Sequence, residues 1–321
     1  MIYFFSDFYV YTFENLYPLY LKFKELGVEC YFDADFSRQG QELSQKIKKY
    51  NGTSNLNKIR KGELPRPKLV ILNQCWSGIG PKLSKEFSSK GVPVITTEHG
   101  SPMLYYGHGH YRGDLKGSCL HPTWGNVGKQ LMVKFGCKSN MVPALGSPRI
   151  DHYFSKREIT SDKTNNAVIF GTAEEGTRPW STSIQEKIEI ICKKHDNVKF
   201  KGKNQGLMKL ANLDCINKDF SSDDFYKLFN DIGHAYFWFP SSLMTIAKIM
   251  GCKTYALYSD SQCHWTKEYF IKHKSHIFSY ESEQDVNADS NLKFLSDNLT
   301  PGGTDNIINF ILNEKSFNIN N

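Results

Sequence analysis

Short apolar segments alternate with amphipathic ones through the first part of the chain. The segments that predict buried strands are residues 2–5, 28–32, 69–72 and 92–97. Residues 15–26 place apolar side chains at helical spacing before Gly27, which predicts a helix that ends there. Strands that alternate with helices in this way form a parallel sheet covered by helices.

The same alternation restarts near residue 167. The segments that predict strands are residues 167–172, 198–201, 235–239 and 254–257. The segments that predict helices are residues 184–194, residues 221–232 and residues 243–250. The second part of the chain therefore predicts a second parallel sheet.

A polar segment, residues 151–166, separates the two patterns and is typical of a linker. The length of 321 residues also exceeds the usual size of one hydrophobic core. We therefore expect an α/β protein with two Rossmann-like domains, residues 1–155 and residues 156–321. Their parallel sheets are expected to face a central cleft.

The charge balance narrows the classes of partner. The chain has 40 Lys and Arg against 33 Asp and Glu, a net charge of +7, which favours anionic partners but also serves solubility alone. Eight cysteines without a C-x-x-C pair indicate reduced thiols in a cytoplasmic protein. No apolar run approaches the roughly 20 residues of a membrane span, so we expect no integral membrane association.

Two histidines, His99 and His121, follow short apolar runs, and His99 comes just after the strand predicted at residues 92–97. Open α/β sheets bind ligands at the carboxyl ends of their strands. A neutral imidazole can accept a proton near pH 7. We therefore expect His99 and His121 to be catalytic; the alternative for each is a loop histidine bonded to the backbone.

A predicted strand, a turn and a helix meet at Pro240, Ser241 and Ser242. A helix that begins at such a turn can bind a phosphate through its N–H groups and its dipole. The alternative is that Ser241 only caps the helix. Gly171 and Thr172 end the first strand of the second domain and are further candidates for nucleotide contacts, although the glycine pattern is neither a P-loop nor a dinucleotide fingerprint.

Three short motifs carry a family resemblance. They are His99-Gly100-Ser101-Pro102, Gly146-Ser147-Pro148-Arg149, and Ser241-Ser242 before a helix that ends at Gly251-Cys252-Lys253. The motifs resemble GT-B glycosyltransferases and, more closely, the CDP-glycerol glycerophosphotransferase (teichoic acid polymerase) family. The resemblance implies a GT-B fold whose first domain binds the acceptor and whose second binds the nucleotide donor. It also implies His99 as general base, His121 as a further substrate contact, and the two serines as ligands of the donor phosphates.

Transfer from a nucleotide-diphosphate donor needs a base at the acceptor hydroxyl and N–H or cationic groups at the leaving diphosphate. His99 could supply the first, and the two serines with Arg149 the second. The alternative for Arg149 is a surface pair with Asp151 or Glu158. With these groups at the diphosphate, we expect metal-independent chemistry and no cofactor besides the nucleotide-sugar substrate.

Contacts with the acceptor are expected in the first domain. Tyr105, His108 and His110 lie in a glycine-bearing segment that could close over a sugar or a base. The two histidines lack the carboxylate or cysteine neighbours of a zinc site, so we predict no metal. Lys58 and Arg60 belong to a basic stretch that could follow the phosphates of DNA or of a teichoic-type polymer. The alternative is a solvated basic loop.

The leading interpretation is a glycosyltransferase that moves a sugar from a nucleotide-diphosphate donor to a hydroxyl on a polyanionic acceptor. A hydroxymethylated base in duplex DNA is one candidate acceptor and would have to be flipped out of the duplex. One alternative is a CDP-glycerol-type glycerophosphotransferase that acts on a cell-surface polymer. Another is a sugar-nucleotide 2-epimerase, and a third is a binding module without activity.

Overall fold

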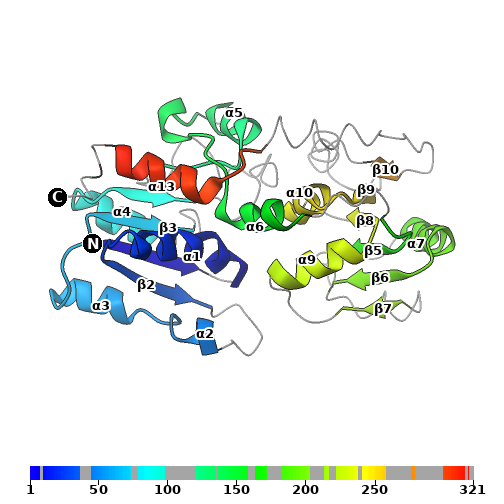
Figure 1. The fold of residues 1–321 in the computed structure, drawn as a ribbon, viewed down its shortest axis with the longest axis horizontal. Helices are drawn as coiled ribbons and strands as arrows, with labels where there is room; N and C mark the ends of the chain where they lie inside the picture. The colour runs from blue at the N-terminus through cyan, green and yellow to red at the C-terminus, as the bar shows by residue number, and fades with distance from the viewer. Residues whose placement is uncertain are drawn as a thin grey trace. The chain divides into compact units, whose positions relative to one another are not determined.

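The chain folds into two compact units (Figure 1). The computed structural model describes residues 1–7, 10–36, 45–73, 78–97, 120–134, 136–157, 163–171, 182–202, 213–216, 222–237, 241–257, 276–278, 299–314 and 317. Unit 1 comprises Met1–His152 and Asp297–Asn321, and unit 2 comprises Tyr153–Ser296. Each unit is built on a parallel sheet, which confirms the expected α/β fold.

The sheet of unit 1 has four strands in the order β2-β1-β3-β4. They are β1 (Ile2–Asp7), β2 (Cys30–Asp35), β3 (Leu69–Leu72) and β4 (Val94–Thr96). All pairings are parallel, and Ile2 of β1 lies opposite both Cys30 of β2 and Leu69 of β3. The chain builds outward from β1 to β2 on one side and to β3 and β4 on the other. The direction of winding therefore reverses between β1 and β3.

Helices α1 (Val10–Glu25), α2 (Gln45–Lys48), α3 (Ser54–Lys61) and α4 (Gly80–Ser89) lie between these strands in the sequence. After β4 come α5 (Asn126–Lys134), a 3-10 turn at Ser139–Met141, and α6 (Pro148–Lys156), which continues past the end of unit 1 at His152. Near the C-terminus, α13 (Gly303–Asn313) also belongs to unit 1. The predicted helix at residues 15–26 is α1, which begins earlier than expected. The linker expected at residues 151–166 is wrong in its first part, because α6 continues to Lys156. Pro148 suits the first position of a helix, and the buried Ile150 and Tyr153 hold α6 in place.

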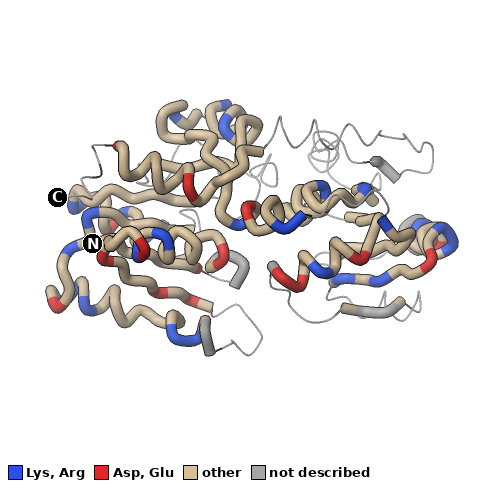
Figure 2. Tube along the Cα trace, in the orientation of Figure 1, with Lys and Arg blue, Asp and Glu red and all other residues tan. Residues whose placement is uncertain are grey.

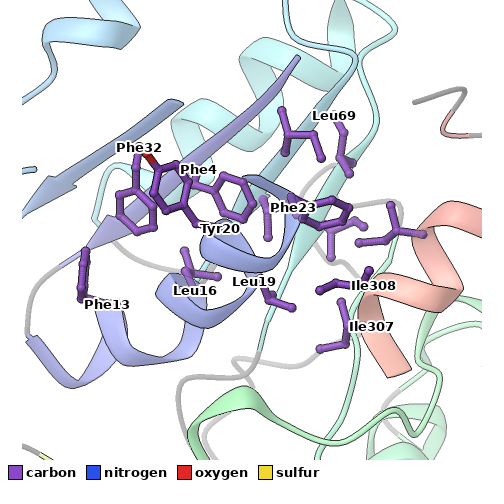
Figure 3. Packing of buried hydrophobic residues seen from close by; sticks show 14 of the residues in the cluster. Phe4, Phe13, Leu16, Leu19, Tyr20, Phe23, Phe32, Leu69, Ile307 and Ile308 are labelled. Atoms are coloured by element: carbon purple, nitrogen blue, oxygen red, sulfur yellow. The ribbon is translucent and has the colours of Figure 1, made fainter. Parts of the chain in front are cut away.

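Side chains of β1 alternate between the two faces of its sheet. Ile2 and Phe4 enter one buried cluster, whereas Tyr3 and Phe5 enter another on the opposite face. On the first face, α1 packs its aromatic and leucine side chains over the sheet (Figure 3). There the rings of Phe4 and Phe32 stack with centroids 5.8 Å apart. The hydrophobic run of the first strand is thus buried on both faces, as a parallel sheet requires.

The C-terminal helix α13 belongs to unit 1. Its Ile307, Ile308 and Ile311 are at most 3% exposed and join the cluster that contains Ile2 and Phe4 (Figure 3). We expected residues 156–321 to form one domain, and the placement of residues 297–321 corrects that boundary. The physical reason is that the apolar face of α13 is buried against elements from the other end of the chain.

Two glycines allow α13 to approach the Gly-Ser-Pro-Arg motif closely. A Cβ on Gly303 would lie 2.6 Å from the carbonyl carbon of Gly146, and closer still to the backbone nitrogen of Ser147. Asp151 of α6 caps the N-terminus of α13. Its carboxylate accepts hydrogen bonds from the backbone N–H groups of Gly303 at 2.9 Å and Thr304 at 2.8 Å. This motif therefore holds the C-terminal helix on unit 1.

The sheet of unit 2 has six parallel strands in the order β10-β9-β8-β5-β6-β7. They are β5 (Ala167–Phe170), β6 (Val198–Lys201), β7 (Asp214–Cys215), β8 (His234–Phe237), β9 (Lys253–Leu257) and β10 (His276–Phe278). The strands expected near residues 167, 198, 235 and 254 are confirmed, and β7 and β10 are additional. Here the winding reverses between β5 and β8, which pair directly.

The helices of unit 2 in the described ranges include α7 (Thr182–Lys194), α9 (Ser222–Asp231) and α10 (Ser242–Ile249). Ile188 and Ile191 of α7 pack with Ile169 and Phe200 of the sheet. The helices expected at residues 184–194, 221–232 and 243–250 are thereby confirmed. Unit 2 has its own core.

In the described ranges, no helix is long and apolar enough to cross a membrane. The described cysteines Cys30, Cys137, Cys192 and Cys252 are free thiols. Cys252 is buried, its Sγ donates to Phe229 O at 3.4 Å, and desolvation raises its pKa to about 12. Free thiols at these positions agree with the expected reduced cysteines, and two of the four, Cys137 and Cys252, are buried. The cytoplasmic location stays a prediction.

A chain of rings on unit 2 contains two histidines. The rings are those of His195, His234, Tyr236 and Tyr255, and the centroids of the two imidazoles are 4.3 Å apart. His195 Nδ1 lies 3.2 Å from the carbonyl oxygen of Asn165, which can only accept, so Nδ1 carries the proton. Nε2, at 2.8 Å from the hydroxyl of Tyr236, then accepts from that hydroxyl. The neutral imidazole thus has both nitrogens satisfied.

Desolvation lowers the pKa of His195 below the ordinary value of 6.5, and the charge of Lys194 lowers it further. The hydrogen bond to the backbone of Asn165 and the charge of Asp196 raise the pKa, but by less. We therefore expect the free energy of unfolding to fall as the pH drops below about 6.5, because the unfolded chain then takes up a proton that the folded chain refuses. The neutral His195 ring contributes fully to stability above that pH. This contribution is lost as the pH falls toward the lower pKa of the folded state. Urea unfolding at neutral pH and at about pH 5 measures it.

His195→Gln is the matched variant for this pH effect, because an amide can hydrogen-bond but does not titrate. We expect a smaller difference in stability between the two pH values for the variant than for the wild type. An equal difference in both proteins would assign the acid sensitivity to carboxyl groups and remove His195 from it.

Candidate functional site

The carboxyl edge of the second sheet is where a ligand site is expected, because the strand order reverses there. In open parallel sheets, the loops that leave two neighbouring strands in opposite directions at such a point open a crevice. In unit 2 this point lies between β5 and β8. Gly171 directly follows β5, and Ser241 opens the helix that comes after β8. The sequence prediction of a nucleotide site named residues at both of these ends.

The N-terminus of α10 is capped by its own serine. Ser241 has an extended backbone (φ −141°, ψ 140°), and its hydroxyl accepts a hydrogen bond from the N–H of Leu243 at 3.2 Å. The capping alternative is therefore correct for Ser241 as an N-cap. Ser242 follows at 9% exposure. The Ser241 hydroxyl uses one of the free N–H groups of the first turn and leaves the positive end of the helix dipole in place, so a cap and a phosphate site are compatible.

Thr245 is the most informative side chain of this helix. It is 1% exposed, and its hydroxyl oxygen has no hydrogen-bond partner. Residues three and four positions apart share one helix face, and side chains lean toward the N-terminus, so Thr245 lies beneath Ser241 and Ser242. An unpaired buried hydroxyl costs about 1 to 3 kcal/mol, which a ligand at this helix end would recover.

A buried lysine adds charge to the same helix. Lys248 is one turn beyond Thr245 and is 2% exposed. A buried ammonium favours a nearby anion more strongly than one in water does, because the local dielectric is low. The polar side chains of α10 are thus one serine, a threonine and a lysine, preceded by the N-cap Ser241, on a helix that is otherwise apolar.

The other predicted donor contacts are described only in part. The N–H of Gly171 donates to Lys201 O at 3.0 Å and so continues the pairing of β5 with β6. Gly171 can offer a ligand close approach of its backbone, but its N–H is already used. Thr172 and Pro240 lie outside the described residues.

In unit 1, His121 is fully buried and not on an open loop. Its Nδ1 lies 2.9 Å from the hydroxyl of Thr96, and its backbone N–H donates to Met141 O at 2.7 Å. Leu120 pairs with Ile95 of β4, so this segment extends the sheet. Burial of the ring favours a positioning role at the end of β4. A catalytic role for His121 stays a prediction, and His99 lies outside the described residues.

Arg149 is buried at 5% exposure near the start of α6. The alternative of a surface pair with Asp151 is wrong in one respect, because a residue this deeply buried is not on the surface. Asp151 itself caps α13. A buried guanidinium must be satisfied inside the fold, so the burial favours a structural role for Arg149. A phosphate contact from Arg149 stays a prediction.

The basic stretch is partly neutralised within unit 1. Arg60 of α3 forms two hydrogen bonds with Glu86 of α4, at 2.7 and 3.3 Å, and Lys90 reaches the same carboxylate at 3.1 Å. The pKa of Glu86 is lowered, chiefly by the bond from Arg60. Lys58 is exposed on the same helix. Figure 2 shows Lys and Arg interspersed with Asp and Glu along the described chain.

The remaining acceptor residues, Tyr105, His108 and His110, lie outside the described residues. Within the described part of the chain, no group of three His, Cys, Asp or Glu side chains is arranged to hold a metal ion. Two polar residues at the carboxyl edge of the first sheet were not predicted from the sequence. Asp7 is the last residue of β1, and Asn73 directly follows β3. A polar residue directly after an apolar run was the signal that could have found them.

Comparison with solved structures identifies the fold. A UDP-GlcNAc 2-epimerase from Neisseria meningitidis bound to UDP-GlcNAc is 12% identical, with a TM-score of 0.60 over 98% of this chain and 100% of that one. The S. aureus MnaA–UDP structure is 12% identical, with a TM-score of 0.62 over 97% and 96% of the two chains. The glycosyltransferase SnogD from Streptomyces nogalater is 10% identical, with a TM-score of 0.58 over 97% and 99%.

The fold is GT-B-like. No family model and no curated protein matches the sequence. The expected resemblance to GT-B enzymes is therefore confirmed at the level of the fold, whereas membership of the CDP-glycerol glycerophosphotransferase family is not shown. The structural neighbours include UDP-GlcNAc 2-epimerases and glycosyltransferases.

Proposed function

We propose that the protein is a nucleotide-sugar-dependent glycosyltransferase whose unit 2 binds the donor diphosphate at the N-terminus of α10. One observation carries the proposal. The buried hydroxyl of Thr245 lacks a partner beneath a helix N-terminus that lies where the strand order reverses. An oxygen-rich anion at this place satisfies both the hydroxyl and the helix dipole.

The chemistry of transfer follows from these groups. The bond between the sugar and the diphosphate breaks while the acceptor hydroxyl forms a new bond to the sugar and loses a proton. Negative charge grows on the leaving diphosphate, and the positive end of α10 with the hydroxyls of Ser242 and Thr245 stabilises it. His99 takes the proton of the acceptor hydroxyl. Independence of a metal ion belongs to this proposal.

Thr245→Val tests the diphosphate site directly. Valine keeps the shape of threonine but removes the hydroxyl, so we expect the affinity for UDP to fall about three- to tenfold, the value of one hydrogen bond. We expect the thermal midpoint without ligand to stay the same or rise, because an unpaired buried hydroxyl is replaced by a methyl group. Calorimetric titration with UDP and thermal unfolding measure the two effects.

Thr254→Val is the matched control for this variant. Thr254 lies in β9, is 2% exposed and has a partner in the fold. The same chemical change there should reduce stability and leave UDP binding unchanged. Wild-type UDP affinity in Thr245→Val, or a loss of stability as large as that of the control, would contradict a ligand role for the Thr245 hydroxyl.

Sugar-nucleotide 2-epimerisation is the second candidate function. The likeness to the N. meningitidis UDP-GlcNAc 2-epimerase over 98% of this chain favours it. An epimerase needs no acceptor, so incubation with UDP-GlcNAc alone, followed by NMR of the sugar, separates the two functions. An epimer without acceptor supports epimerisation. The acceptors to add are a sugar, a polyol phosphate and hydroxymethylated duplex DNA. A product that forms only after one of them is added supports transfer and identifies the class of acceptor.

A further inference from the structure

The first sheet has its own point of reversed strand order, between β1 and β3, and two side chains occupy its carboxyl edge. Asp7 is the last residue of β1, and Asn73 directly follows β3. Both are 1% exposed. This is the position in unit 1 that corresponds to the α10 site in unit 2, because open α/β sheets bind ligands where the winding reverses.

The orientation of the Asn73 amide is fixed by its neighbour. The backbone N–H of Asp7 donates to Asn73 Oδ1 at 2.7 Å, so Oδ1 is the acceptor end and Nδ2 is the donor end. Nδ2 is buried and has no hydrogen-bond partner. The amide lies across the ends of β1 and β3 with its two donor hydrogens unused. Leaving buried donors unsatisfied costs free energy unless a ligand accepts from them.

The charge at this edge selects the kind of ligand. Asp7 Oδ2 accepts hydrogen bonds from the N–H groups of Ile79 at 3.1 Å and Gly80 at 3.0 Å, at the start of α4. The positive end of that helix is therefore already matched by a carboxylate. A second anion beside Asp7 would be repelled. A neutral oxygen, such as a sugar hydroxyl or an amide carbonyl, can accept from Asn73 without this repulsion.

We propose that Asn73 is a substrate-binding residue of unit 1 that donates its amide hydrogens to a neutral oxygen of a sugar. This inference rests on the proposed sugar-nucleotide function and assigns to unit 1 the recognition of uncharged sugar groups, separate from diphosphate binding at α10. Thr97 flanks the position at the end of β4, where its N–H donates to Leu72 O at 2.8 Å. The edge of the sheet next to Asn73 is thus held in place by the backbone.

The test compares Asn73→Asp with the wild type. Aspartate keeps an oxygen for the N–H of Asp7, removes the two donor hydrogens and adds a negative charge. N-acetylglucosamine is the neutral probe and UDP is the probe of the α10 site, each titrated by calorimetry. We expect the affinity for N-acetylglucosamine to fall about tenfold in the variant and the affinity for UDP to stay unchanged. Asn73→Ser, which adds no charge next to Asp7, takes the place of Asn73→Asp if that variant does not fold.

Asn51→Asp is the matched control. Asn51 Oδ1 also accepts from a backbone N–H, that of Phe36 at 3.1 Å, but Asn51 is exposed. It should bind both probes as the wild type does. Equal affinity of the wild type and the Asn73 variant for N-acetylglucosamine, or no binding to the wild type at millimolar concentrations, overturns the inference. The UDP titration of the wild type judges the diphosphate site by itself, so failure of one proposal is distinguishable from failure of the other.

Discussion

Gly303→Ala is expected to lower the free energy of unfolding by about 3 kcal/mol, at the upper end for an overpacked site. The new Cβ would lie 2.6 Å from backbone carbons of Gly146 and Ser147, and backbone atoms cannot rotate away. Relief of the clash requires α13 to move, which exposes Ile307, Ile308 and Ile311. Burial of one such side chain contributes about 1.5 to 3 kcal/mol. Urea unfolding of the full chain measures the change.

Gly27→Ala is the control for a glycine in open space. Gly27 has a φ of 76°, and no atom lies within 4 Å of the position that a Cβ would take, so alanine there carries only backbone strain. That strain costs about 1 kcal/mol. A Gly303→Ala protein as stable as the wild type would show that α13 is not held against the Gly-Ser-Pro-Arg motif. A loss no larger than that of Gly27→Ala would show that the contact yields easily.

The strands could be predicted because their signal is local. Residues 69–72 and 167–170 are apolar runs that are buried on both faces, and the structure has strands at both places. β7 has only two residues, Asp214–Cys215, and its composition carries no such signal. Its pairing with β6 exists only because β6 is already in the sheet.

The placement of α13 could not be predicted from its own residues. The apolar positions Ile307, Ile308 and Ile311 fit one helix face, but they do not say which sheet that face covers. The information lies in pairs of residues far apart in sequence, such as Gly146 with Gly303 and Asp151 with Thr304. A motif that resembled part of a substrate site therefore has a structural role at the helix junction.

In the candidate site, too, only the residues with a local sequence signal could be predicted. Ser241 was predicted because a serine before an apolar helix is a local signal of a helix start. Thr245 and Asn73 were missed, because the lack of a partner for a buried hydroxyl or amide appears only after every neighbour is placed. His121 was expected on a loop after a short apolar run, and the structure buries its ring next to the segment where Leu120 pairs with Ile95.

His99→Ala is expected to reduce the rate of sugar transfer by about 10²- to 10⁴-fold, the usual contribution of a general base. The chain leaves β4 through Thr96 and Thr97, whose N–H groups donate to Leu120 O at 3.0 Å and Leu72 O at 2.8 Å. His99 follows Thr97 by two residues in the sequence. Binding of UDP should stay unchanged, because the proposed diphosphate site belongs to unit 2.

The pH profile adds a second readout for His99. A protonated imidazole cannot accept a proton, so the wild-type rate should fall as the pH is lowered. His195→Gln is the matched control, since it removes a histidine from the ring chain of unit 2 and should keep the wild-type rate at neutral pH. Full activity of His99→Ala would remove His99 from the mechanism. Loss of UDP binding together with the rate would show that this residue serves the fold or the donor, and that the acceptor proton is taken by another group.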